Sequence, residues 1–269
     1  MMEPSGFDQN TILKEIHTKW AGKTVHFAKE TDSTNLWAKK LAEEGASHGT
    51  LAVAEFQTAG RGRFERRWTA KEGSSIMMSL ILRPEFSPQY ASMLTLVMGL
   101  SVAQAVRETG VEVSIKWPND VVVSRKKICG ILTEMKLSGK EIQHVVIGVG
   151  INVAQEEMPE EVRDKATSLF METGRRLDRN LLLAEILEKF EGNYELFQKT
   201  RDLQELKEAY NEILANREQP VRVLNGAASF EGIALGIDRS GVLLVKRETG
   251  EVIKVSAGEV SVRGLYSYV

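Results

Sequence analysis

Residues 142–150, Ile-Gln-His-Val-Val-Ile-Gly-Val-Gly, form a nearly continuous apolar run. A run of this kind is typical of a strand that is buried on both faces, so we expect it to lie near the centre of a sheet. Shorter apolar or alternating segments precede it in the sequence. The other strands predicted for this sheet are 24–28, 51–56, 75–82, 111–117, 119–123 and 128–135.

Helical periodicity is clearest in residues 91–109, where apolar residues share one face and Gly110 follows. Further helices are predicted for 9–20, for a segment from Asp32 or Ser33 to Gly45, for a segment that Asn180 caps, and for 202–215. Such a series of strands and helices predicts an α/β domain.

The texture of the sequence changes after Asn216. Five short alternating segments occupy residues 219–263, with turn signals at 225–226, 238–241 and 249–250. This pattern predicts a small all-β barrel. We therefore divide the chain into an N-terminal helical extension (1–23), a central domain (24–216) and a C-terminal barrel (217–269).

Composition excludes several classes of protein. The 269 residues have ordinary globular proportions and a net charge of −2, whereas proteins that bind long nucleic acids usually carry a basic excess. The single cysteine, Cys129, excludes an internal disulfide framework and is expected to be a small core residue. No apolar run of about 18 residues and no signal peptide are recognised, so we expect no membrane span and a soluble cytoplasmic protein.

Residues 60–68, Gly-Arg-Gly-Arg-Phe-Glu-Arg-Arg-Trp, place four arginines and one glutamate in a nearly neutral protein. Glycines let backbone N–H groups approach a ligand, and guanidinium groups bind carboxylate or phosphate. The loop is therefore either an anion site or a solvated charged turn. The spacing matches neither a Walker A loop nor a Rossmann fingerprint.

A second charged segment is Lys116-Trp117-Pro118-Asn119-Asp120. Lys116 ends a predicted strand, where a cation stabilises developing negative charge if a substrate lies beside it; otherwise the segment is a plain hairpin turn. In the same way, Gly148 and Gly150 mark either a ligand contact or a bulge in the central strand.

These segments, in this order, resemble the biotin protein ligases. The matching motifs are Asp32-Ser33-Thr34-Asn35, Gln57 with Gly60-Arg61-Gly62-Arg63, Lys116–Asp120, Lys127–Leu132, Gly148–Asn152 and Gly258–Arg263. The resemblance covers about residues 28–263. It implies an α+β fold: a mixed-sheet catalytic domain like that of class II aminoacyl-tRNA synthetases, followed by an SH3-like barrel.

The resemblance also implies a reaction. Biotin and ATP, with Mg²⁺, give biotinyl-5′-AMP, and a lysine of a biotin carboxyl carrier protein domain then takes the biotinyl group. Implied biotin contacts are Ser33, Thr34, Asn35, Gln57, Gly60, Arg61, Gly130, Gly148 and Gly150. Implied adenylate contacts are Arg63, Trp68, Lys116 and Asn152. Implied catalytic residues are Arg61, Arg63, Lys116, Lys127 and Asp120, and Asp120 is expected to orient or help deprotonate the carrier lysine. No carboxylate pair marks the Mg²⁺ ligands, which stay unassigned.

Two departures from the family pattern stand out. Many members carry a glycine where this chain has Glu65, so the loop tip is expected to be less flexible and less positive. Bifunctional members have a winged helix-turn-helix domain before the catalytic domain, whereas 31 residues precede Asp32 here, so we expect a monofunctional enzyme that binds no operator DNA. A homodimer stays open. The alternatives are a lipoate or octanoate ligase and a non-catalytic biotin-responsive protein.

Overall fold

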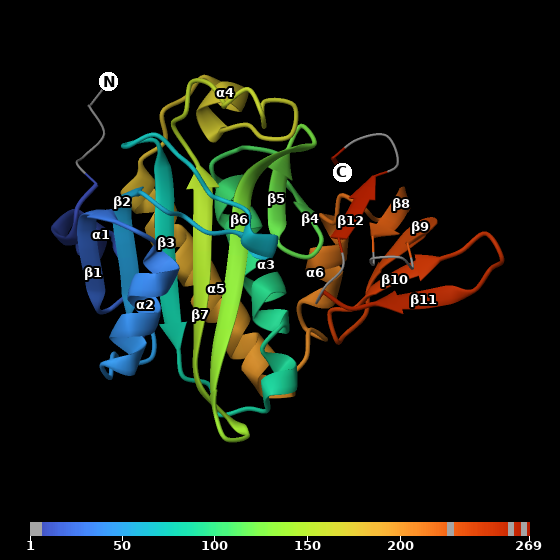
Figure 1. Ribbon diagram of the computed structural model, residues 1–269, viewed down its shortest axis with the longest axis horizontal. Helices are drawn as coiled ribbons and strands as arrows, with labels where there is room; N and C mark the ends of the chain where they lie inside the picture. Colours follow the sequence, from blue (N-terminus) through green and yellow to red (C-terminus); the bar gives the residue numbers. More distant parts are fainter. Residues whose placement is uncertain (1–6, 225–228, 258–260, 265–267) are drawn as a thin grey trace.

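The computed structural model describes residues 7–224, 229–257, 261–264 and 268–269. Its main element is a seven-stranded sheet in the order β1-β2-β3-β7-β6-β5-β4 (Figure 1). β1 and β2 run parallel, and every other neighbouring pair is antiparallel, so the sheet is mixed. The strands are β1 (Val25–Thr31), β2 (Leu51–Gln57), β3 (Ser75–Leu82), β4 (Ser114–Lys116), β5 (Asp120–Val123), β6 (Lys126–Ser138) and β7 (Glu141–Asn152).

The apolar run 142–150 lies within β7, which is the middle strand of the seven. Residues 144–149 are buried, because sheet neighbours flank the strand and helices cover both faces. Helix α2 (Thr34–Glu43) packs on one face, against β2, β3 and β7. Helices α3 (Met93–Glu108) and α5 (Arg179–Thr200) pack on each other across the opposite face (Figure 1). The prediction of a central buried strand is confirmed.

The remaining helical segments are short. Helix α1 (Gln9–Glu15) packs against α5 and β1. The others are α4 (Leu169–Thr173), α6 (Lys207–Glu212) and the 3₁₀ turns η1 (Arg63–Glu65) and η2 (Pro88–Tyr90). The sequence did not predict α4, whose five residues are too few to show periodicity.

The C-terminal part forms a second, five-stranded antiparallel sheet in the order β11-β10-β9-β8-β12. Its strands are β8 (Pro220–Leu224), β9 (Phe230–Ile237), β10 (Leu243–Lys246), β11 (Val252–Val255) and β12 (Ser261–Gly264). The five predicted β segments are confirmed. The predicted turn at 225–226 and residues 258–260 of the tail motif lie outside the described residues.

Three predicted helix boundaries are wrong. The first helix ends at Glu15 because the N–H groups of Lys19, Trp20 and Ala21 donate to the Glu191 carboxylate rather than to helix carbonyls. Helix α5 begins at Arg179, where Asp178 rather than Asn180 accepts the first N–H groups. Helix α6 is shortened because residues 213–215 pair with Ile115 of β4.

Cys129 is fully buried in β6, as expected for a core residue. Burial raises the pKa of its thiol well above the ordinary value.

The segment Pro88–Glu108 is long and apolar enough to cross a membrane by length and composition alone. However, 72% of its most apolar window is buried within the fold, as in the core helix of a globular domain.

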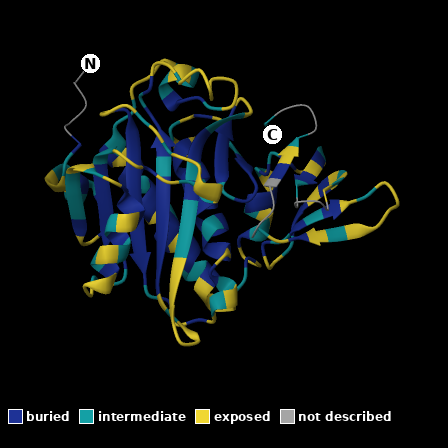
Figure 2. Cartoon of the chain, in the orientation of Figure 1, coloured by how far each residue is buried: buried dark blue, intermediate teal, exposed yellow. Residues whose placement is uncertain are grey.

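The two sheets meet at the β4 side of the main sheet (Figures 1 and 2). The Trp117 indole N–H donates to the Gly241 carbonyl at 3.1 Å. The Asn211 carboxamide exchanges two hydrogen bonds with the backbone of Ile237, at 2.8 and 3.1 Å. All these groups are buried, so the seam beside β4 is tightly fixed.

Candidate active site

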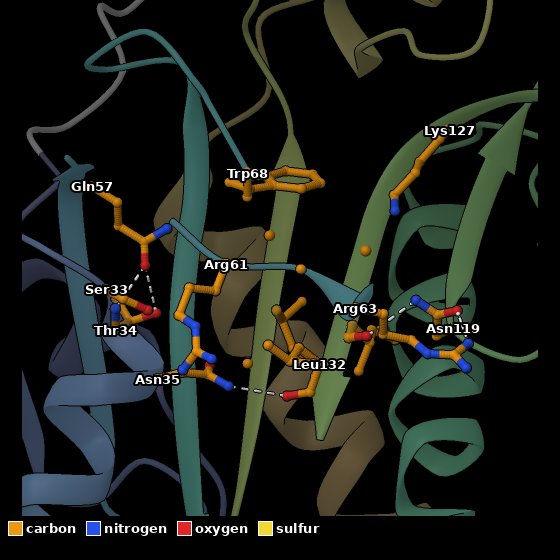
Figure 3. Close-up of a pocket in the computed structure, with 16 residues that line it drawn as sticks. Ser33, Thr34, Asn35, Gln57, Arg61, Arg63, Trp68, Asn119, Lys127 and Leu132 are labelled. Carbon is orange, nitrogen blue, oxygen red and sulfur yellow. Dashed lines mark hydrogen bonds between the residues drawn. The ribbon is translucent and has the colours of Figure 1, made fainter. Parts of the chain in front are cut away.

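A cavity that is partly open to solvent lies over β6 and β7 (Figure 3). The Gly-Arg loop, residues 60–68, and the start of α2 supply the rest of its walls. In Figure 3, Gln57, Ser33 and Thr34 lie at one end, and Arg63, Asn119 and Lys127 lie at the other. The lining residues are 33–35, 57, 61–63, 68, 119, 127, 130–132 and 148–150. The structure thus brings together most of the residues selected from the sequence.

One end of the cavity is neutral and polar. Thr34 donates its backbone N–H and its hydroxyl to Gln57 Oε1, at 2.7 and 3.0 Å, and both bonds fix the Gln57 carboxamide. The hydroxyl oxygen of Ser79 lies 2.7 Å from Asn35 Oδ1 and 2.9 Å from Thr34 Oγ1. Ser33 caps α2 by position alone, without a side-chain hydrogen bond to the helix, and it faces the cavity. These side chains offer donors and acceptors without formal charge, and the charged groups nearest to them, Arg61 and Glu134, pair with each other at 3.7 Å.

Glycines make room in the cavity floor. A Cβ at Gly148 would lie 1.8 Å from Asn35 Oδ1, and one at Gly150 would lie 2.5 Å from the Trp68 ring. The pairing of β7 with β3 is regular at both positions, so the alternative of a bulge is wrong there. The two glycines instead let Asn35 and Trp68 approach the backbone of the central strand.

The opposite end is cationic. Lys127 Nζ lies 2.5 Å from Asp120 Oδ1, and Lys116 Nζ lies 4.0 Å from Asp120 Oδ2. Lys116 ends β4 and Asp120 begins β5, so the hairpin of these two strands holds Lys116 and Asp120 close together. Both residues are buried: 6% of Lys116 and 8% of Asp120 is exposed. The prediction that Lys116 ends a strand is confirmed.

Burial and neighbouring charge set the protonation of this cluster. Burial lowers the pKa of Lys116 to about 8, although attraction to Asp120 opposes that shift. Burial alone would raise the pKa of Asp120, but Lys127 and Lys116 hold that pKa below its ordinary value. Asp120 is therefore a poor proton acceptor, and its geometry favours holding the two ammonium groups over deprotonating a carrier lysine.

The Gly-Arg loop folds into a tight hairpin over the cavity. Gly62 N–H donates to the Arg66 carbonyl and Trp68 N–H donates to the Gly60 carbonyl. Arg63 donates to Asn119 Oδ1 at 3.0 Å and to the Ala257 carbonyl at 2.7 Å, so it ties the loop to both sheets. The backbone of the loop and its Arg63 are thus organised, whereas the Arg61, Arg66 and Arg67 side chains are exposed.

Beside this loop, a second hollow gathers positive charge. Its cationic lining residues are Arg63, Arg66, Arg67, Lys116, Lys127 and Arg263, and among the described residues that line it Asp120 is the one carboxylate. Dense positive charge on a loop and on strand ends suits a polyphosphate. Within the described part of the chain, no three His, Cys, Asp or Glu residues are grouped as a metal site.

The tip of the loop is conformationally unusual. Glu65 and the preceding Phe64 have φ of 57° and 55°, in the left-handed region that favours glycine. A glycine at position 65 would adopt that conformation without strain.

An ion pair connects the loop to the cavity floor: Arg61 Nη1 lies 3.7 Å from Oε1 of Glu134 in β6.

Four predicted site residues do not line the first cavity: Lys116 and Asp120 line the second, cationic hollow, and Gly60 and Asn152 line neither. Asn152 is held by other polar groups. Its amide donates to the Thr167 carbonyl at 3.0 Å, and its oxygen accepts from Gln155 at 2.9 Å. Contact with an adenine edge would require one of these hydrogen bonds to exchange.

Two polar residues of the site were missed in the sequence. Glu134 accepts from Asn35 at 2.9 Å and pairs with Lys39 at 2.5 Å. Tyr268 contacts Asp120 and Lys116. Glu134 faces the site because β6 presents alternate residues to it, a signal that the alternation from Leu132 to Glu134 contains. No local signal marks Tyr268.

A mixed sheet that carries a polar cavity beside a cationic hollow suits an enzyme that joins a small organic acid to a nucleotide phosphate. The Biotin/lipoate A/B protein ligase family model matches residues 27–152, and the Biotin protein ligase C terminal domain model matches residues 218–263. The chain belongs to the biotin protein ligase family.

Individual relatives agree with this assignment. The chain is 40% identical to the bifunctional ligase/repressor BirA of Bacillus subtilis, over 94% of this chain and 78% of that protein. It is 33% identical to the biotin–[acetyl-CoA-carboxylase] ligase of Paracoccus denitrificans, over 86% of this chain and 97% of that protein. Among solved structures, the chain is similar to the biotin protein ligase from Aquifex aeolicus in complex with biotin and ATP, with a TM-score of 0.79. The two sequences are 36% identical, and the alignment covers 90% of this chain and 99% of the Aquifex aeolicus chain.

Proposed function

We propose that this protein activates biotin with ATP and transfers it to a lysine of a biotin carboxyl carrier protein domain. In the first step a biotin carboxylate oxygen attacks the α-phosphorus, which forms biotinyl-5′-AMP and releases pyrophosphate. In the second, the lysine amine attacks the acyl carbon, which forms an amide and releases AMP. The single observation that carries the proposal is the continuity of the neutral polar end and the cationic end across one cavity wall.

The polar end fits the biotin head group. The ureido ring has two N–H donors and one carbonyl acceptor, and Ser33, Thr34 and Gln57 offer hydroxyl and carboxamide partners there. The backbone around Gly130 and Gly148 closes the floor. A lipoyl or octanoyl chain has no ureido group to satisfy these polar side chains, so this end favours biotin.

The cationic end fits the two reacting anions. The biotin carboxylate and the α-phosphate repel each other, and Arg61, Arg63, Lys116 and Lys127 supply the charge that brings them together. We assign Lys116 to stabilise the pentavalent phosphorus and Trp68, which stands over the strands in Figure 3, to stack on adenine. Mg²⁺ would arrive bound to ATP, since the described residues of this hollow offer only the Asp120 carboxylate, which two lysines already hold.

We also propose that the two sheets correspond to two functional domains, a catalytic biotin and ATP domain at 24–216 and a C-terminal domain at 217–269. The hydrogen bonds from Arg63 to Ala257 and from Trp117 to Gly241 couple them at the site. Removing the C-terminal sheet would therefore remove the hydrogen bond from Arg63 to the Ala257 carbonyl.

We expect adenylation to depend on pH through Lys116. With a pKa of about 8, its ammonium is charged below that pH and neutral above it. The rate should therefore fall as pH rises through about 8. The measurement is kcat/KM for biotin-dependent pyrophosphate exchange against pH. In Lys116→Arg the decline should move to higher pH, because a guanidinium stays charged. A wild-type profile that is flat across this range would contradict the assigned charge.

We expect the Gly-Arg loop to close over bound adenylate. Arg61, Arg66 and Arg67 are exposed in the free protein and are trypsin sites. Arg61, Arg63 and Trp68 would together meet the phosphate and adenine, which excludes water from the anhydride. Limited trypsinolysis should cut between Arg61 and Arg67, and biotin plus ATP should slow that cut far more than ATP alone. Equal cleavage rates would show that the loop is not the lid.

We propose that the chain binds no operator DNA. It has 35 basic and 37 acidic residues, and its net charge of −2 gives no general attraction to phosphates. A footprinting assay on a biotin-operon palindrome at about 0.15 M salt should show no protection, with or without biotin and ATP. Protection that requires both ligands would overturn this proposal.

A further inference from the structure

The last described residues of the chain, Tyr268 and Val269, lie on the main sheet beside the cationic hollow. The backbone oxygen of Val269 accepts a hydrogen bond of 2.7 Å from Arg125, in the turn between β5 and β6. The Val269 side chain is buried, with 4% of the residue exposed. These contacts fix residues 268–269 next to the β4–β5 hairpin, which carries Lys116 and Asp120.

Tyr268 touches both members of the Lys116–Asp120 pair. Its hydroxyl donates to Asp120 Oδ2 at 2.5 Å, and its ring centroid lies 3.7 Å from Lys116 Nζ. The two charged groups are themselves 4.0 Å apart, at the limit of an ion pair. Tyr268 therefore lies closer to Lys116 and to Asp120 than these two residues lie to each other.

An aromatic ring suits this position. A carboxylate in close contact would neutralise the Lys116 ammonium, whereas the face of a ring attracts the cation and adds no formal charge. The ammonium needs such a restraint, because most charges around it repel it. The charged groups that face it are Asp120 of β5, Lys127 of β6, Arg66 of the Gly-Arg loop and Arg263 of β12.

We propose that Tyr268 is a positioning residue for adenylation, one that holds the Lys116 ammonium in place toward the phosphate while its hydroxyl orients Asp120. This inference rests on the proposed function. It assigns a role in the first half-reaction to a residue from the end of the chain, 152 positions away from the lysine that it orients.

Two variants separate the contacts of Tyr268. Tyr268→Phe keeps the ring over Lys116 and removes the hydrogen bond to Asp120. Tyr268→Leu removes both and admits water to Lys116 Nζ. We expect kcat for pyrophosphate exchange to fall about 10-fold in Tyr268→Phe, from the loss of one hydrogen bond to a charged group. In Tyr268→Leu, which also loses the cation–π contact, it should fall about 50-fold. Biotin affinity should stay unchanged, because the polar end of the cavity is untouched.

The pH profile gives a second readout, which a purely structural role would not move. With water at Lys116 Nζ, the alkaline decline should shift to higher pH in Tyr268→Leu and stay in place in Tyr268→Phe. Val269→Ala is the matched control, since it removes two methyl groups from the neighbouring residue and keeps the hydrogen bond from Arg125 to the backbone oxygen that fixes the tail. It should keep the wild-type rate and pH profile.

Three results would overturn the inference: a Tyr268→Leu enzyme with wild-type kcat and pH profile, a faster Tyr268→Leu enzyme, or equal losses in Tyr268→Leu and Val269→Ala. A faster enzyme would mean that the ring blocks the phosphate site. Failure of the proposed function is distinguishable, because the wild-type protein would then show no biotin-dependent exchange.

Discussion

Replacing Lys116 with alanine should lower the rate of biotin adenylation by about 10²–10³-fold, the usual effect of removing one group that stabilises transition-state charge. Lys116 is buried at the end of β4, and in the proposed mechanism its charge would meet the phosphate where negative charge develops. Biotin binding should change far less, because the head-group contacts lie at the other end of the cavity. The measurements are pyrophosphate exchange and equilibrium biotin binding on the same preparation.

The comparison with Lys116→Arg sharpens this test. Arginine restores the charge but not the position of the ammonium, so it should recover only part of the lost rate. A Lys116→Ala enzyme that exchanges pyrophosphate as fast as the wild type would remove Lys116 from the mechanism.

Replacing Gly148 with alanine should weaken biotin binding by about 10–100-fold, which corresponds to the 1–3 kcal/mol typical of an overpacked site. The new Cβ would lie 1.8 Å from Asn35 Oδ1, so Asn35 must leave its place beside Ser79 and Glu134. Thr34 lies in the same network, and the polar end of the cavity would be displaced with it. Isothermal titration with biotin measures the effect.

Gly192→Ala is the matched control for this prediction. Gly192 lies within α5, and a Cβ there would meet nothing within 4 Å. Alanine is also the better helix former, so stability should hold or rise by up to about 1 kcal/mol. Biotin affinity should equal that of the wild type. If both alanine variants bound biotin equally well, the close packing of Asn35 on Gly148 would have no part in the site.

Local patterns in the sequence predicted much of this molecule. The apolar run 142–150 indicated the central strand, and β3 has the boundaries 75–82 that the sequence predicted. Lys116 and Asp120 are four positions apart in the sequence, and they lie opposite each other because β4 and β5 pair as an antiparallel hairpin. The resemblance to the biotin protein ligases indicated that the ligands are biotin and ATP, whereas hydrophobic periodicity predicts only helices and strands.

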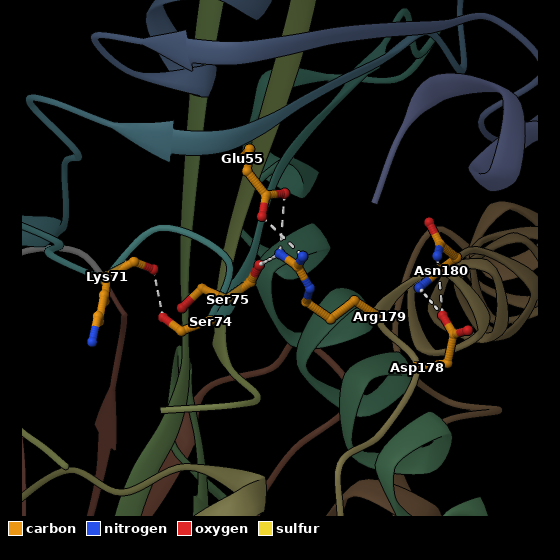
Figure 4. A network of polar contacts seen from close by, with 7 residues as sticks. All are labelled: Glu55, Lys71, Ser74, Ser75, Asp178, Arg179 and Asn180. Carbon is orange, nitrogen blue, oxygen red and sulfur yellow. Dashed lines mark hydrogen bonds and ion pairs between the residues drawn. The ribbon is translucent and has the colours of Figure 1, made fainter. Parts of the chain in front are cut away.

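The features that were missed depend on contacts between distant segments. Glu191 ends α1 by accepting three N–H groups from residues about 170 positions earlier. A comparable long-range pair, Arg179 of α5 with Glu55 of β2, joins the helix to the sheet at 2.9 Å (Figure 4). Arg179 also donates to the Ser75 carbonyl at the start of β3. Neither residue forms part of a local pattern, so such contacts emerge only from the folded chain.

The most direct test of the account is transfer of biotin to a purified biotin carboxyl carrier protein domain, followed by mass spectrometry. With biotin and ATP present, we predict that the carrier gains one biotinyl group on one lysine. Without ATP it should gain none, and lipoate or octanoate in place of biotin should give no acylated carrier. A carrier that stays unmodified with biotin and ATP, or that accepts lipoate in preference, would contradict the assignment.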